Sequence, residues 1–174
     1  MTDKDKARLY FARNSVHKVG KIVIEGSHDI DEAACIGSDG FGWTRAENGK
    51  LVKVRHSGGV KIGRDVEIRA FVTVDRATRE GNFTEIGDGT KIDHHTHVAH
   101  NCKIGKNNTF ANGCSIEGSC QVGDCNTFGS IVVMQRKTKI GNNNLIGSGA
   151  VITKDFGDNL VIVGNPARVL KENI

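Results

Sequence analysis

The chain has 174 residues, 37% of them hydrophobic and 5% aromatic, and a formal net charge of +4 at pH 7. A chain of this length can bury a core without disulfides or a structural metal. The modest charge includes no long basic run, so neither a nucleic-acid partner nor a membrane surface is indicated. The absence of a signal peptide and of a bilayer-length apolar stretch favours the cytoplasm.

The chain opens on a charged segment followed by Leu9, Tyr10 and Phe11. We expect residues 1–20 to form an N-terminal arm or a short helix. Ile24, Ile30 and Ile36 then recur every sixth residue, and Ile62, Ile68 and Val74 repeat that spacing. These positions predict the first coils of a repetitive fold.

A large aliphatic, phenylalanine or methionine side chain occupies every sixth position over the next 67 residues: Ile86, Ile92, Val98, Ile104, Phe110, Ile116, Val122, Phe128, Met134, Ile140, Ile146 and Ile152. A helix repeats its apolar face every three to four residues and a half-buried strand every two, so neither explains a period of six. Hexapeptides with this period predict a parallel β-helix, with three hexapeptides in each triangular coil of about 18 residues.

Small or compact residues stand two positions before each of these side chains. Among them, Asn108, Asn126 and Asn144 are one coil apart. We expect their side-chain amides to stack as a ladder inside one corner, because stacked amides satisfy polar groups that the turns bury.

Two segments interrupt the repeat. Residues 38–59 carry several glycines together with Phe41 and Trp43, and predict a loop extruded from a coil. Long loops in compact folds are usually functional, although a plain insertion is the alternative. The second interruption, residues 75–85, keeps the phase of six and predicts a distorted coil. We place the β-helix domain at residues 21–155 and a C-terminal cap at 156–174, because a solenoid needs its open ends covered.

Cysteine and histidine clusters suggest other chemistry. Cys102 and Cys120 are one coil apart, but their parallel side-chain directions disfavour a bridge, so reduced core thiols are expected. His94, His95, His97 and His100 fall within seven residues. Tetrahedral zinc needs convergent ligands, whereas these histidines point along two successive faces, so no metal site is expected.

Three motifs carry a resemblance to a known family: the segments over residues 36–42, 66–76 and 98–105. They resemble the lipid A pathway's UDP-3-O-acylglucosamine N-acyltransferases, and residues 97–102 also resemble UDP-N-acetylglucosamine O-acyltransferases. The resemblance covers residues 36–150. It implies a left-handed parallel β-helix that assembles as a homotrimer, with active sites in the grooves between subunits.

The same resemblance assigns catalytic roles. It makes His100 the general base that removes a proton from the attacking amine or hydroxyl, and a neutral imidazole suits this task. It makes the backbone N–H of Gly118 the oxyanion donor, one coil later. Asp93 matches an acidic residue of the N-acyltransferase motif and is a candidate to orient the imidazole, and Asp75 is a weaker candidate. The alternative is that both are solvated turn carboxylates.

The chain departs from these enzymes in two respects. Lys137 stands where they carry a second histidine. Only about 20 residues precede the first repeat, so neither their uracil-binding domain nor their helical extension is expected. Long-chain transfer from acyl carrier protein therefore has less support.

The C-terminal motifs, residues 146–155 and 163–168, resemble acetyl-CoA-dependent sugar acetyltransferases. That resemblance implies that the backbone of Gly147 and Ser148 lines the pantetheine. It also implies that Lys154, Arg168 and Lys171 face the CoA phosphates. The alternative is that this segment is only an end cap with solvated charges.

The resulting hypothesis is an acyltransferase that moves an acyl group, acetyl from acetyl-CoA in the first instance, onto an amine or hydroxyl of a sugar or nucleotide-sugar. Three alternatives stay open. The first is the lipid A pathway N-acyltransferase itself, using an acyl carrier protein thioester. The others are a metal-dependent protein of carbonic anhydrase type and a non-catalytic scaffold.

Overall fold

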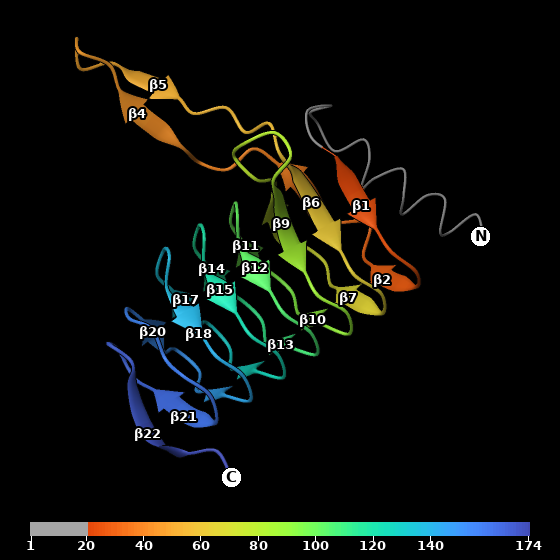
Figure 1. Cartoon of the computed structure of the whole chain (residues 1–174), viewed down its shortest axis with the longest axis vertical. Coiled ribbons are helices and arrows are strands. Elements are labelled where there is room, and N and C mark those ends of the chain that lie inside the picture. The colour runs from red at the N-terminus through yellow and green to blue at the C-terminus, as the bar shows by residue number, and fades with distance from the viewer. Residues whose placement is uncertain (1–20) are drawn as a thin grey trace.

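The structure is a computed structural model and describes residues 21–174, so the arm or helix expected for residues 1–20 lies outside the described residues. Short parallel strands stack into three flat faces, which confirms the left-handed β-helix (Figure 1). In residues 21–174, no helix is long and apolar enough to cross a membrane.

The three faces, here called A, B and C, follow one another in every coil. Face A contains β1 (Ile22–Ile24), β6 (Gly59–Ile62), β9 (Phe83–Ile86), β12 (Lys103–Ile104), β15 (Gln121–Val122) and β18 (Lys139–Ile140). Face B contains β2 (His28–Ile30), β7 (Val66–Ile68), β10 (Lys91–Ile92), β13 (Thr109–Phe110), β16 (Thr127–Phe128), β19 (Leu145–Ile146), β21 (Leu160–Val163) and β22 (Arg168–Glu172). Face C contains β3 (Cys35–Ser38), β8 (Thr73–Asp75), β11 (His97–Val98), β14 (Ser115–Ile116), β17 (Val133–Met134) and β20 (Val151–Ile152).

The residues with period six form the core. All twelve from Ile86 to Ile152 are buried, and Phe110 stacks on Phe128 with ring centroids 4.4 Å apart. In each two-residue strand the second side chain points inward and the first points outward. A period of six therefore buries one large side chain on each face of every coil.

Both interruptions emerge where the chain passes from face C to face A. Ile24 pairs with Ile62, and Ile62 with Ile86, so the insertions lengthen these coils without breaking their register. The first insertion carries an antiparallel hairpin, β4 (Trp43–Arg45) and β5 (Leu51–Lys53), that projects from the stack (Figure 1). We call it the arm.

The stack continues past residue 155. Phe156 bridges to Ile140, Ile162 pairs with Ile146, and β22 closes face B in antiparallel orientation. The last 19 residues thus complete part of another coil before they cover the open end.

The five cysteines are free. Cys102 and Cys120 lie buried in successive coils, and their thiols donate to the carbonyls of Glu117 and Gln135, each at 3.1 Å. Backbone acceptors within the core therefore satisfy both thiols.

Candidate active site

Several candidate site residues lie along one edge of the β-helix. We call it the C–A corner, the set of segments that connect face C to face A. His100, Gly118, Arg136 and Lys154 occupy the same place in four successive coils, and both insertions start from this corner. The repeat therefore places His100 beside Gly118 and near the start of the first insertion, where a Cβ on Gly40 would stand 3.2 Å from Cδ2 of His100.

Arg76 fastens both ends of the first insertion. Its buried guanidinium donates from Nε to the carbonyl of His56 at 3.0 Å and from Nη1 to the carbonyl of Gly37 at 3.1 Å. Nη2 of the same guanidinium pairs with Oδ1 of Asp39. Gly37 and Asp39 lie at the start of the first insertion, and His56 lies near its end. Because Arg76 bonds to all three, it holds the insertion to the stack.

Asp75 lies buried beside that root. Its Oδ1 accepts a hydrogen bond of 2.9 Å from the Ser38 hydroxyl, and its Oδ2 lies 3.6 Å from Nε2 of His97. Nδ1 of His97 lies 2.7 Å from the hydroxyl of Thr73. These contacts hold a carboxylate in place at the edge of the C–A corner.

The imidazole of His100 lies in a slot between two glycines. A Cβ on Gly118 would stand 2.6 Å from Cε1 and 2.7 Å from Nε2 of His100. A Cβ on Gly40 would stand 3.2 Å from Cδ2 of His100 and 3.1 Å from Oδ2 of Asp75. Glycine at positions 40 and 118 therefore leaves room for the ring. The contact between Gly118 and His100 agrees with their spacing of one coil.

The electrostatics favour a neutral His100. Burial, and after it the neighbouring His56, lowers the pKa of His100 below its ordinary value. A lowered pKa keeps the imidazole unprotonated near neutral pH, which is the form that accepts a proton. The Gly118 N–H donates no hydrogen bond to another described residue.

Asp93 does not lie beside His100, contrary to our expectation. Asp93 precedes β11 and lies at the corner between faces B and C, whereas His100 follows β11 and lies at the C–A corner. Seven residues is a little more than one side of the triangle, which separates the two side chains. Asp93 instead contacts Nδ1 of His94 at 2.6 Å, and the backbone N–H of His94 holds the pKa of Asp93 below its usual range.

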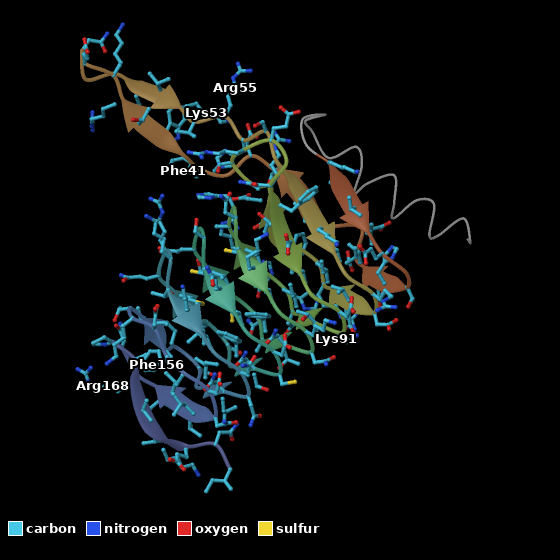
Figure 2. All side chains as sticks on the ribbon, in the orientation of Figure 1. Phe41, Lys53, Arg55, Lys91, Phe156 and Arg168 are labelled. Atoms are coloured by element: carbon cyan, nitrogen blue, oxygen red, sulfur yellow. The ribbon has the colours of Figure 1, made fainter. Side chains whose placement is uncertain are left out.

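The residues expected to bind CoA fall into three places in one chain. Lys154 lies at the C–A corner, Gly147 and Ser148 lie at the corner between faces B and C, and Arg168 and Lys171 lie on β22. Packing alone explains why a glycine stands at position 147, since a Cβ there would stand 2.9 Å from Cγ1 of Val163. Figure 2 shows Arg168 at the opposite end of the stack from Phe41 and the arm.

The other clustered histidines have separate partners. His95 stacks on Phe71 with ring centroids 5.0 Å apart, while His94 and His97 contact Asp93 and Thr73. Within residues 21–174, no group of three histidine, cysteine or carboxylate side chains is arranged to hold a metal ion.

His56 was not predicted from the sequence. Its side chain is 2% exposed, and its ring centroid lies 5.1 Å from that of His100. It belongs to the first insertion, where the period of six assigns no positions. The only available signal was that a long loop leaves and rejoins the corner that holds His100.

Comparisons with known proteins agree with this architecture. The family model for the bacterial transferase hexapeptide (six repeats) matches residues 83–118. The UDP-3-O-acylglucosamine N-acyltransferase of Shewanella denitrificans is 50% identical over 60 residues, which cover 34% of this chain and 17% of that protein. The chain thus spans less than a fifth of that relative's length.

Solved structures share the fold over more of the chain. The Arabidopsis UDP-N-acetylglucosamine acyltransferase superposes with a TM-score of 0.74 and 25% identity, covering 89% of this chain and 57% of that one. A mutant of perosamine N-acetyltransferase from Caulobacter crescentus, in complex with CoA and GDP-perosamine, has a TM-score of 0.59 and 19% identity over 83% and 57%. The chain is therefore a hexapeptide-repeat, left-handed β-helix protein that resembles acyltransferases in sequence and in fold.

Proposed function

We propose that this protein transfers an acyl group from a thioester to an amine or hydroxyl of a sugar, with His100 as the general base. The observation that carries the proposal is the slot at the C–A corner. It holds a half-buried imidazole with a lowered pKa against Gly118, whose N–H has no partner among the described residues. A base and an oxyanion donor in adjacent coils are the two groups that direct acyl transfer requires.

The reaction needs no covalent enzyme intermediate. The acceptor's proton moves to His100 while the acceptor atom bonds to the thioester carbonyl carbon. The Gly118 N–H donates to the oxyanion that forms. The C–S bond then breaks, and the thiolate leaves with the proton that His100 carries. Cys102 and Cys120 are buried within the core, so neither is placed as a nucleophile.

The donor that we propose is acetyl-CoA. Lys154 lies three coils from His100 along the C–A corner, about 15 Å at the spacing of neighbouring strands. A pantetheine arm along this edge would bring the thioester to His100 and the phosphates toward Lys154. The Caulobacter perosamine N-acetyltransferase, which shares this fold, is a complex with CoA.

The remaining CoA residues require a second copy of the chain. Gly147, Ser148, Arg168 and Lys171 do not converge with Lys154 in one chain, but they would do so across a groove between subunits. Face C is suited to such contact because, apart from the buried Asp75 at its edge, its outward side chains include no Lys, Arg, Asp or Glu, in contrast to faces A and B: Cys35, Thr73, His97, Ser115, Val133 and Val151. Depletion of charge is typical of an interface core, which supports the proposed homotrimer. Analytical ultracentrifugation of the wild type and of Val133→Glu tests it, and a monomeric wild type would contradict it.

The acceptor that we propose is a nucleotide-linked sugar in the cytoplasm. Phe41 and Trp43 make an edge-to-face contact at 6.3 Å, both are exposed, and Phe41 directly follows Gly40 of the His100 slot (Figure 2). Lys53, at the end of β5, is exposed and pairs with Asp39 at 3.4 Å, and Arg55 stands exposed two residues further on. Aromatic faces and cations near the slot suit a base and its phosphates.

Titration calorimetry with acetyl-CoA, and separately with a long-chain acyl carrier protein thioester, tests the donor. We expect saturable binding of acetyl-CoA in the micromolar range, about one per subunit. Binding of only the carrier protein thioester would favour the lipid A branch, which the Shewanella relative supports. Binding of neither would contradict acyl transfer.

A further inference from the structure

His56 is a buried histidine with no role in the reaction proposed above. Its Nδ1 lies 3.1 Å from the carbonyl oxygen of Val54. A carbonyl oxygen only accepts hydrogen bonds, so Nδ1 carries the proton. Neutral His56 therefore keeps a lone pair on Nε2, and this atom is an acceptor without a donor.

Two buried nitrogens in this site lack hydrogen-bond partners. Among the described residues, the buried side-chain nitrogen and oxygen atoms without a partner are Nε2 of His56 and Nδ1 of His100. Buried polar atoms are rarely left unpaired in native proteins, and each exception calls for an explanation. Here the two exceptions belong to neighbouring rings.

The separation of the rings suits a hydrogen bond between them. Their centroids are 5.1 Å apart and their planes are inclined at 58°. An N–H···N bond of about 3 Å between facing ring edges corresponds to centroids about 5 Å apart. Catalytic hydrogen bonds are often unaligned in the free enzyme and tighten when substrate binds.

The surroundings restrict both rings and leave few competing partners. Arg76 holds the backbone of His56, and Gly40 lies against both imidazoles, because a Cβ there would stand 2.8 Å from Nε2 of His56 and 3.2 Å from Cδ2 of His100. The other groups that act on the pKa of His100 are Asn101, through a side-chain hydrogen bond, and Arg136 and Asp75, through their charges. The carboxylate of Asp75 already accepts from Ser38 and faces His97.

We propose that His56 is the positioning residue for His100, and this inference rests on the acyl transfer proposed above. Nε2 of His56 accepts the Nδ1–H of His100, which leaves the lone pair of His100 on Nε2, the atom beside Gly118. His100 then takes the acceptor's proton at Nε2 and returns it to the leaving thiolate. His56 keeps its own Nδ1–H throughout. It does the task that the family resemblance assigned to Asp93.

The tautomer of His100 in the wild-type protein tests this inference without any activity measurement. Two-bond ¹H–¹⁵N correlation spectra of ¹⁵N-histidine-labelled protein at about pH 8, where imidazoles are neutral, distinguish the two tautomers. His100→Gln identifies the signal by its loss. We expect the Nδ1–H form, and the Nε2–H form would overturn the inference even if acyl transfer is confirmed.

Two variants separate positioning from packing. His56→Phe keeps a ring but removes the acceptor, whereas His56→Gln retains a side-chain acceptor. We expect His56→Phe to lower kcat/KM about tenfold to a hundredfold, less than loss of the base itself, and to abolish the tautomer preference of His100. His56→Gln should restore part of both. A packing role would give the opposite order, because the aromatic ring fills the space better, and that order would overturn the proposal.

His28 provides a matched control. Its Nδ1 also faces the carbonyl two residues earlier, at 3.2 Å from the Gly26 oxygen, but it lies on β2 of the first coil. His28→Gln should leave kcat/KM and the His100 tautomer unchanged. Circular dichroism and thermal melting show whether each variant is folded, and the wild-type spectrum decides the question if the His56 variants are not.

Discussion

Two corners of the β-helix share the same repeating backbone but differ in the side chains they hold. At the corner between faces A and B, Asn108, Asn126 and Asn144 stack inside the coil, and each amide donates to the one before it, at 3.0 and 2.9 Å. At the C–A corner, His100 and Gly118 instead belong to a polar site capped by an insertion. Repetition of the same side chain at one position therefore stabilises the coils, whereas the site forms where an insertion interrupts the repeat.

The largest expected effect is the loss of Arg76, which joins the irregular corner to the regular stack. Arg76→Ala leaves the carbonyls of Gly37 and His56 without their donor and leaves Asp39 with only Lys53, at 3.4 Å, so we expect a loss of about 3 kcal/mol in the free energy of unfolding. Urea denaturation measures it. Arg79→Ala, in the exposed part of the second insertion, is the control, and equal stabilities of the two variants would show that the loop root bears no such energy.

Removing one rung of the asparagine ladder tests the regular corner. Nδ2 of Asn126 donates to Asn108 and to the carbonyl of Gly141 at 2.9 Å, and its Oδ1 accepts from the next rung. Asn126→Ala should therefore cost about 2 kcal/mol. The exposed Asn112→Ala should change stability by less than about 0.5 kcal/mol. Thermal or urea unfolding of the pair compares them, and a neutral Asn126→Ala would remove the ladder's stabilising role.

A methyl group in the slot displaces the base without removing it. Gly118→Ala would place a Cβ against the ring of His100, so we expect kcat to fall about tenfold with little loss of stability. Gly157→Ala is the matched control, because a Cβ there meets no atom within 4 Å. Steady-state kinetics measures both. Equal kcat values for the two variants would mean that the ring position is not critical.

The smallest expected effect concerns the far end of the stack. Arg168→Ala should raise the KM for acetyl-CoA several-fold and leave the KM for the sugar unchanged, because it removes one exposed charge that we propose faces the CoA phosphates. Lys61→Ala, an exposed cation of an early coil, should change neither value. An unchanged KM for acetyl-CoA in Arg168→Ala would place the cofactor elsewhere.

Periodicity predicted most of the fold but only part of the site. The core residues, the asparagine ladder and the stacking of Gly118 beside His100 follow from spacings of six and 18, because each spacing fixes a face and a coil. The placement of Asp93 was wrong because it followed a motif match, whereas a spacing of seven, a little more than one side of the triangle, puts Asp93 one corner away from His100. His56 was beyond prediction, since its position depends on how Arg76 folds an insertion back onto the stack.

The rate of acyl transfer from acetyl-CoA by His100→Ala, measured beside the wild type, tests the central claim most directly. We expect turnover to fall by about a hundredfold or more while circular dichroism and melting temperature stay close to the wild-type values, as is usual when a general base is lost. Near-normal turnover in the purified, folded variant would contradict the assignment of the C–A corner as the active site.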